Sequence, residues 1–198
     1  MPVTNVVIAG VGGQGAVLAS ELLALAAMAA GQDVKQGEFH GVAQRGGAVF
    51  SHVRFGERVH SPMAPRGRVD VLVALEKLEA LRYAHFVKPG GIVIVNDYKV
   101  EPVRVGDQRP YPDEAIDFLR TKGFRVIALE ATHVALDLGD HRAANVVLLG
   151  ALSRALDIPD TAWERTLEER IPEQHLELNR RAFAAGREAT FQTLTVLA

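Results

Sequence analysis

The sequence predicts an α/β domain of three layers, with a largely parallel sheet and a helical C-terminal part. Strand-like and helix-like segments alternate over residues 5–129, and helical patterns dominate after Asp140. Several strands are nearly continuous apolar runs, as expected of strands covered on both faces. The chain of 198 residues is long enough for one such domain with its own core, and no repeat or linker indicates a second. We therefore predict a single Rossmann-like domain over residues 1–198.

The first half of the chain opens with a strand, a glycine turn and a helix. An apolar strand over residues 5–9 enters the turn over residues 10–15, and an Ala- and Leu-rich helix runs to Ala30, where Gly31 ends it. The segments expected next are a short strand over 33–36, a loop over 37–47, a strand over 48–55, an irregular stretch over 59–68 and a buried strand over 69–75.

The second half continues the alternation and then becomes helical. Asp140 is expected to cap one helix, and a capping box that begins at Thr161 is expected to start the next. The expected segments are a helix over 76–86, a turn over 88–91, a buried strand over 92–96, an edge strand or hairpin over 98–109, a helix over 112–123, a strand over 124–129 and helices over 140–156, 161–171 and 173–190 or beyond.

Composition excludes several classes of function. Hydrophobic residues make up 48% of the chain, charged residues 23%, and the net charge is −2, so no overall field favours nucleic acid or an anionic membrane. There are no cysteines, which excludes disulfides, thiolate catalysis and iron–sulfur clusters held by this chain alone. The apolar segment over 16–30 contains Ser20 and Glu21 and is too short to span a bilayer comfortably. A strand-like run and a glycine turn come before it, with no basic residue, so we do not expect it to be a signal peptide. We expect a cytoplasmic setting.

Gly10, Gly12 and Gly15 form a G-x-G-x-x-G pattern between a strand and a helix. In that context the backbone N–H groups of a helix N-terminus can face a phosphate. The alternative is a tight turn that only packs the helix on the strand. A dinucleotide site would also need an acidic residue at the end of the second strand. Asp33 lies at the start of that strand and Glu38 lies within the following loop, which argues against NAD.

A second glycine-rich segment, residues 37–47, shows no helical or strand period. Its polar residues His40, Gln44 and Arg45 stand among small residues and are followed by Gly46 and Gly47. His40 could titrate near neutrality or donate a hydrogen bond, and the planar guanidinium of Arg45 suits a carboxylate or phosphate. Alternatively, Gln44 and Arg45 hold nearby backbone carbonyls or an adjoining subunit in place.

Charge is unevenly distributed, and candidates for independent catalysis are few. Five arginines and one acid lie in residues 44–68, whereas seven acids and two arginines lie in residues 157–177. These are either solvated faces or, for the basic stretch, a surface for an anionic ligand or an acidic partner. No histidine pair has metal-binding spacing, and no nucleophile elbow or P-loop lysine is present. Asn145, in an apolar helical run, either bonds to the glycine-turn region or is exposed.

Taken together, these motifs resemble the gamma domain of the 2-oxoacid:ferredoxin oxidoreductases. The small (beta) subunits of the indolepyruvate ferredoxin oxidoreductases are the most similar in overall pattern. The resemblance covers nearly the whole chain. It rests on residues 8–15 (IAGVGGQG), 40–47 (HGVAQRGG), the strand at 51–55, the helix around Asn145 with Leu149 and Gly150, and residues 179–186 (NRRAFAAG).

The resemblance implies a subunit that assists catalysis by a partner. Such enzymes oxidatively decarboxylate a 2-oxoacid, pass the acyl group to coenzyme A and reduce ferredoxin. Thiamine diphosphate and the iron–sulfur clusters would belong to the large subunit, so no cofactor is expected on this chain alone and no catalytic residue is assigned to it. The residues carried over by motif are Gly10, Gly12, Gly13, Gln14, Gly15, His40, Gly41, Gln44, Arg45, Gly46 and Gly47, with Asn145 in support.

On this interpretation both loops face the active site of the partner, where they contact coenzyme A or close the substrate cavity. Gln14 and Arg45 are the expected polar contacts. The 2-oxoacid stays open among indolepyruvate, phenylpyruvate, pyruvate and branched substrates. A free-standing module that binds NAD or FAD, a scaffold without a ligand, and a homodimer of the isolated chain are the alternatives.

Overall fold

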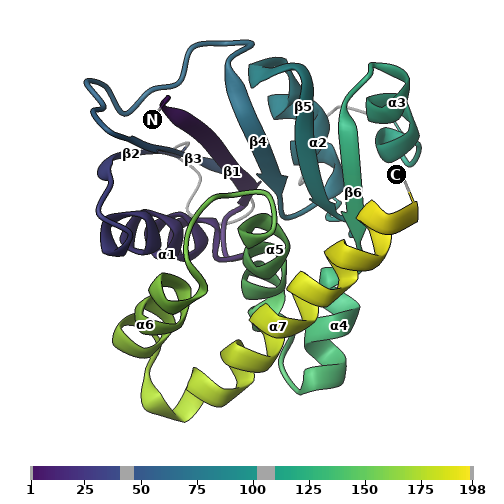
Figure 1. The fold of residues 1–198 in the computed structure, drawn as a ribbon. Coiled ribbons are helices and arrows are strands. Elements are labelled where there is room, and N and C mark those ends of the chain that lie inside the picture. The colour runs from purple at the N-terminus through teal and green to yellow at the C-terminus, as the bar shows by residue number, and fades with distance from the viewer. Residues whose placement is uncertain (1, 41–46, 102–109, 197–198) are drawn as a thin grey trace.

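The computed structural model describes residues 2–40, 47–101 and 110–196. Its strands form one sheet in the order β2-β3-β1-β4-β5-β6 (Figure 1). The parallel pairs are β1 with β4, β4 with β5 and β5 with β6, whereas β3 runs antiparallel to both β1 and β2. The strands are β1 (Thr4–Val11), β2 (Asp33–His40), β3 (Ala48–Gly56), β4 (Val69–Ala74), β5 (Val87–Asn96) and β6 (Arg125–Leu129). The predicted, largely parallel sheet is confirmed.

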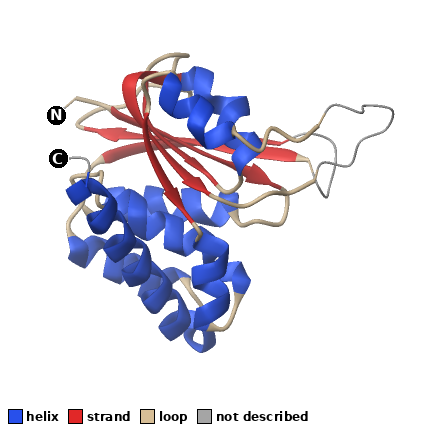
Figure 2. Ribbon diagram, turned by 90° about the vertical axis from the view of Figure 1, so that its right-hand side faces the viewer, coloured by secondary structure: helices blue, strands red, loops and turns tan. Residues whose placement is uncertain are grey.

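Helices cover both faces of this sheet, which gives the predicted three layers (Figure 2). Val6 and Ile8 of β1 join the core beneath the C-terminal helices and α1, while Val7 and Ala9 join the core beneath α2 and α3. The helices are α1 (Ala16–Ala29), α2 (Lys77–Tyr83), α3 (Ala115–Thr121), α4 (Ala131–Leu138), α5 (Ala144–Ser153), α6 (Asp160–Arg170) and α7 (Glu173–Val196), with 3₁₀ turns η1 (Ala84–Phe86) and η2 (His141–Ala143).

The helical C-terminal part is held together by close packing of α5 on α7. A Cβ atom added at Gly150 would lie 2.0 Å from the Phe183 carbonyl oxygen, and one added at Gly186 would lie 1.8 Å from that of Val147. Both positions therefore need glycine, because any side chain would force the helices apart. α5 is buried almost throughout and forms the centre of this layer.

The structure corrects the prediction of a loop over residues 37–47. Residues 37–40 continue β2, with Gly37 opposite His52 and His40 opposite Val49 of β3. The ring of Phe39 stacks on that of Phe50, with centroids 5.0 Å apart. The partner strand and this aromatic contact, rather than a local period, extend the strand.

Four smaller predictions also change. Residues 88–91 belong to β5, beside an irregularity in its pairing with β4, and are not a separate turn. Residues 97–101 contain no strand, because β6 occupies that edge of the sheet, and residues 102–109 lie outside the described residues. α4 follows β6, where no helix was expected. Thr161 lies inside α6 and makes no capping bond, since Pro159 precedes that helix. Asp140, in contrast, caps η2 as predicted.

Candidate functional site

The candidate site lies at the carboxyl edge of the sheet. β1, β4 and β5 end there because they run parallel, and the antiparallel β3 begins there, with Ala48 opposite Val11. After β1 the chain builds the β2–β3 side of the sheet, and from β4 onward it builds the other side. The strand order thus reverses between β1 and β4. In open α/β sheets, ligands bind outside the carboxyl ends of the strands at such a switch point.

The glycine turn connects β1 to α1 at this point. Gly13 and Gly15 have φ angles of +100° and +81°, in the left-handed region that glycine adopts without steric cost. The Gly12 N–H donates to the Gly47 carbonyl at 2.9 Å. This bond joins the turn to the residue that precedes β3. The glycine turn is therefore in contact with Gly47, the last residue of the second glycine-rich segment.

Gln14 folds back over the turn. Its Oε1 accepts a hydrogen bond of 2.7 Å from the Val11 N–H, and its Nε2 donates to the Leu75 carbonyl at 3.4 Å. A Cβ atom at Gly10 would lie 3.0 Å from this Oε1. Gly10 therefore makes room for the Gln14 amide, which ties the turn to the end of β4.

Asn145 holds the other end of the turn. Its side chain is buried, and its Nδ2 donates to the Gly15 carbonyl at 3.1 Å. A Cβ atom at Gly15 would lie 2.4 Å from that nitrogen. Of the two alternatives for Asn145, the bond to the glycine turn is the one observed, and it fixes α5 against the start of α1.

The second loop is described only at its ends. His40, the last residue of β2, is exposed, and Gly47 accepts the bond from Gly12. Gly41, Gln44, Arg45 and Gly46 lie outside the described residues, so their contacts stay predictions.

A pocket of about 210 Å³, here called the switch pocket, opens between the ends of β1, β4 and β5. Leu75, Val100 and Leu148 give it apolar walls, and Tyr98 adds an aromatic ring. Its polar groups come from Gln14, Asn96, Thr132, His141 and Arg142. Gly13 and Ala144 complete the lining.

Asn96 organises the polar part of the switch pocket. This buried side chain donates to the Leu75 carbonyl at 3.1 Å and to Thr132 Oγ1 at 2.8 Å. It also accepts a bond of 3.3 Å from the Thr132 N–H. Asn96, Tyr98 and Thr132 are not among the site residues predicted from the sequence. Only Asn96 carried a signal, as a polar residue at the end of an apolar strand.

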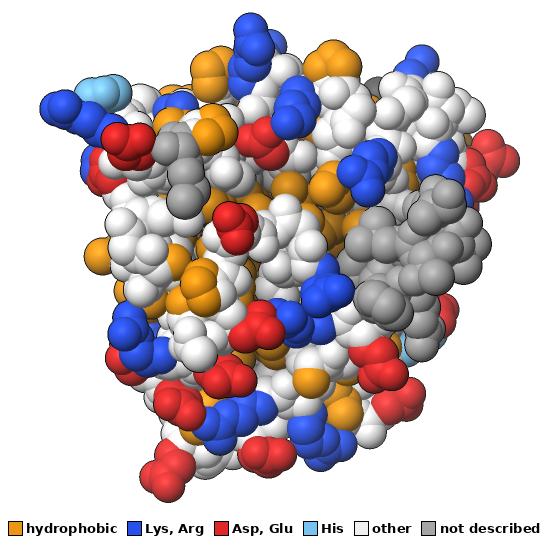
Figure 3. Space-filling model, in the orientation of Figure 1, with side chains coloured by type: hydrophobic (Ala, Val, Ile, Leu, Met, Phe, Trp, Pro, Cys, Tyr) orange, Lys and Arg blue, Asp and Glu red, His pale blue; other side chains and the backbone are white. Residues whose placement is uncertain are grey.

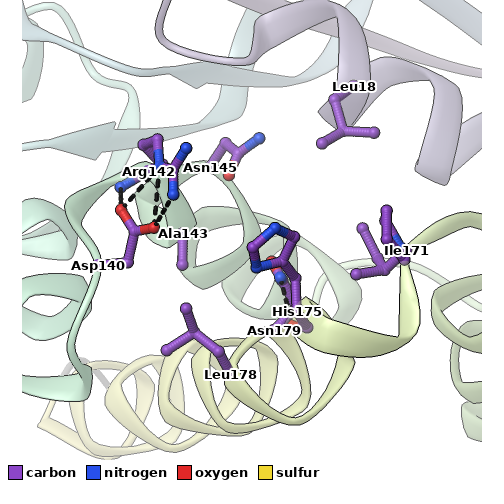
Figure 4. Close-up of a pocket in the computed structure, with 10 residues that line it drawn as sticks. Leu18, Asp140, Arg142, Ala143, Asn145, Ile171, His175, Leu178 and Asn179 are labelled. Carbon is purple, nitrogen blue, oxygen red and sulfur yellow. Dashed lines mark hydrogen bonds and ion pairs between the residues drawn. The ribbon is translucent and has the colours of Figure 1, made fainter.

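A second pocket, of about 190 Å³, lies beyond Asn145, between the start of α1, η2 and the start of α7 (Figure 4). In Figure 4 the Arg142 guanidinium faces the Asp140 carboxylate, and its Nε lies 2.8 Å from Asp140 Oδ2. Hydrogen bonds from the Arg142 side chain and backbone lower the pKa of Asp140 to about 2. The charge of Arg142 is thus balanced locally. Leu18, Ile171 and Leu178 make the remaining walls mainly apolar.

The geometry disfavours the dinucleotide alternative. β3 lies between β1 and β2, so β2 is two strand spacings, about 10 Å, from the glycine turn. An acidic residue on β2 is therefore not next to the turn, as the ribose contact requires. In addition, the glycines at positions 10 and 15 make room for Gln14 and Asn145 of this chain.

The charged stretches behave mostly as solvated faces. Over α6 and α7, in the lower half of Figure 3, acidic and basic side chains intermingle. Arg170 pairs with Glu21 at 2.8 Å, and Arg180 pairs with Glu168. In the basic stretch, Arg54 donates to Asn5 and to backbone carbonyls.

Within residues 2–40, 47–101 and 110–196, no group of three His, Asp or Glu side chains could hold a metal ion. In the same part of the chain, no helix has the length and apolar character needed to cross a membrane.

The model of the pyruvate ferredoxin/flavodoxin oxidoreductase family matches residues 5–189. The chain belongs to this family. The match includes both glycine-rich segments and Asn145, and it confirms the family predicted from the motifs.

Relatives in the family are of similar length. The chain is 39% identical over 196 residues to the indolepyruvate oxidoreductase subunit IorB of Thermococcus kodakarensis, covering 96% of this chain and 97% of the relative. It is 42% identical over 187 residues to the subunit of the same name from Archaeoglobus fulgidus, with 92% of each covered.

Solved structures share the fold. The gamma subunit of a keto/oxoacid ferredoxin oxidoreductase from Geobacter sulfurreducens superimposes with a TM-score of 0.72 at 29% identity, covering 96% of this chain and 99% of that one. A 2-oxoglutarate:ferredoxin oxidoreductase from Magnetococcus marinus, with 2-oxoglutarate, coenzyme A and succinyl-CoA bound, has a TM-score of 0.76 at 20% identity. This chain covers 32% of that longer chain, and the likeness concerns the fold alone.

Proposed function

We propose that this chain is the small subunit of a 2-oxoacid:ferredoxin oxidoreductase that acts on an aryl pyruvate such as indolepyruvate. Relatives with that subunit name match nearly the full length of the chain at 37–42% identity. The absence of cysteine means that any iron–sulfur cluster must be held by another chain. A cytoplasmic complex with a larger, cofactor-bearing subunit accounts for both facts.

The carboxyl edge is proposed as the surface that faces the large subunit. The observation that carries this proposal is the Gly12–Gly47 hydrogen bond, which joins the glycine turn to the residue before β3 at the switch point. Gln14 and Asn145 brace the turn from within through bonds to backbone groups. Val17, in the first turn of α1 beside it, is an apolar side chain that is 38% exposed. A rigid, partly apolar edge of this kind suits a stable subunit interface.

Thiamine diphosphate bound to the large subunit would supply the decarboxylation chemistry, and iron–sulfur clusters there would carry electrons to ferredoxin. In this proposal the present chain helps to bind and orient coenzyme A, and it closes the substrate cavity against water. Coenzyme A would run along the carboxyl edge. The switch pocket, at about 210 Å³, is smaller than the 300–1,000 Å³ typical of whole-ligand pockets and would hold only part of that molecule.

Reconstitution tests this function. The large subunit would be purified alone and with this chain, and dye reduction would be measured with indolepyruvate, phenylpyruvate and pyruvate, each with and without coenzyme A. The proposal expects coenzyme A-dependent turnover with an aryl pyruvate only when both chains are present. Full activity of the large subunit alone would refute an assisting role.

A further inference from the structure

Tyr98 is an exposed aromatic residue on a firmly held backbone. Its ring lines the switch pocket and the residue is 41% exposed. Its carbonyl accepts a bond of 3.1 Å from the Lys77 N–H at the start of α2, and its N–H donates to the Asn96 carbonyl at 2.7 Å. The Lys77 ammonium also pairs with Asp97 at 3.0 Å. These bonds fix the backbone that presents the ring.

A buried anchor holds a more distant part of the same segment. The Tyr111 hydroxyl donates to Glu76 Oε2 at 2.6 Å and accepts from the Leu78 N–H at 3.0 Å. Glu76 is 1% exposed, and its other carboxylate oxygen caps α2 through the Glu79 N–H. Lys99, next to Tyr98, places its ammonium 4.7 Å from the centre of the Tyr111 ring. The start of α2 therefore secures both Tyr98 and Tyr111.

The pocket beside Tyr98 combines apolar walls with hydrogen-bond donors. Asn96 donates to Thr132 Oγ1, which leaves the Thr132 hydroxyl hydrogen for another acceptor. The Gln14 amide has a second N–H besides the one given to Leu75. Arg142 also lines the pocket. Asp140 balances its charge through bonds to Nε and Nη2, so Arg142 offers the N–H groups of Nη1 as hydrogen-bond donors. Donors next to apolar and aromatic walls favour a flat, apolar group that carries acceptors or a negative charge.

We propose that the switch pocket binds an aromatic ring attached to an anionic group, with Tyr98 stacked on the ring. Its volume suits one ring system rather than a whole cofactor. Holding Tyr98 in place before binding lowers the entropy cost of stacking. Two kinds of ligand share this chemistry: an aryl 2-oxoacid and an adenine nucleotide. The switch pocket lies at the carboxyl edge, which is proposed above to face the large subunit. Ligand binding to the pocket can nevertheless be measured on this chain alone.

Calorimetric titration of the isolated full chain tests the proposal. The aromatic probes are phenylpyruvate and AMP, and their ring-free counterparts are pyruvate and ribose 5-phosphate. We expect one aromatic probe to bind at 1:1 stoichiometry, and the one that binds identifies the source of the ring. Tyr98→Leu should weaken this binding on the order of tenfold, as typical for loss of a stacking side chain, while Tyr98→Phe should retain it.

Three further variants separate positioning from folding. Tyr111→Phe should weaken binding through the lost anchor, whereas Tyr83→Phe, the same deletion at the last residue of α2, should leave it unchanged. His175→Ala in the second pocket should also leave it unchanged. Thermal melts of each variant show that the chain is folded at the titration temperature.

The proposal is overturned if neither aromatic probe binds, if the ring-free probes bind equally well, or if Tyr98→Leu binds like the original chain. Any of these results would leave the subunit role intact, because that role is measured by reconstitution with the large subunit.

Discussion

Removing the Tyr111 hydroxyl deletes a single oxygen atom but should destabilise the folded chain strongly. The hydroxyl is the donor to the buried Glu76 carboxyl group and the acceptor for the Leu78 N–H. Tyr111 is 6% exposed and Glu76 is 1% exposed, so water cannot easily replace either bond. In Tyr111→Phe both partners lose this contact while the ring and its packing remain.

The magnitude follows from the two bonds. A hydrogen bond to a charged group contributes about 1.5–3 kcal/mol, and one between neutral groups contributes about 1 kcal/mol. We therefore expect Tyr111→Phe to lower the free energy of unfolding by about 2.5–4 kcal/mol at pH 7. Burial, and next the bond to Glu76, raise the pKa of Tyr111, so the phenol stays protonated there.

The assay is urea unfolding of the full chain followed by circular dichroism, with Tyr83→Phe as the matched control. Tyr83 is also mostly buried, and its ring packs against Phe50. A loss in Tyr111→Phe within about 0.5 kcal/mol of the control, which is the usual scale of neutral substitutions, would refute the reasoning. Because the pKa of Tyr111 is raised, its contribution to the free energy of unfolding depends on pH. That contribution is complete below pH 10 and declines as the pH rises above that value.

Three more outcomes follow from the structure. Burial lowers the pKa of His52 to about 4, so the stability that it contributes above pH 6.5 is lost as the pH falls toward 4, and His52→Gln should reduce that slope in unfolding curves. Asp140→Asn should lower stability at pH 7, and its difference from the original chain should disappear as the pH falls from about 4 to 2. Gly186→Ala should cost about 3 kcal/mol or more in a thermal melt, because its Cβ would overlap the Val147 carbonyl, while Glu188→Ala on the exposed face should cost less than about 0.5 kcal/mol.

The layers of the fold could be predicted because they depend on local patterns. Apolar runs marked β1, β4 and β5, and helical spacing marked the C-terminal part. The position of β3 between β1 and β2 could not be predicted, since strand pairing joins residues far apart in the chain. The same pairing turned residues 37–40 into strand, although their own pattern resembled a loop.

The site was predictable where one segment carried the signal. The glycine turn stood out by its spacing, and Asn145 by its polarity within an apolar helix. Tyr98 and Thr132 gave no such signal, because the switch pocket brings together the connection after β5 and the start of α4. The anchor between Glu76 and Tyr111 spans 35 positions and depends on burial that only the folded chain creates.

The central claim is that the carboxyl edge faces the large subunit, and a pair of charge insertions on α1 tests it most directly. Val17 lies in the first turn of α1, beside the glycine turn, whereas Met28, 58% exposed, lies in its last turn, about 16 Å away. A glutamate is favoured by the helix dipole at Val17 and disfavoured at Met28, so the control carries the greater folding cost.

The measurement is the affinity of each variant for the purified large subunit. The account predicts that Val17→Glu weakens the complex at least tenfold, while Met28→Glu binds like the original chain. Equal binding by both variants, or a larger loss for Met28→Glu, would contradict it.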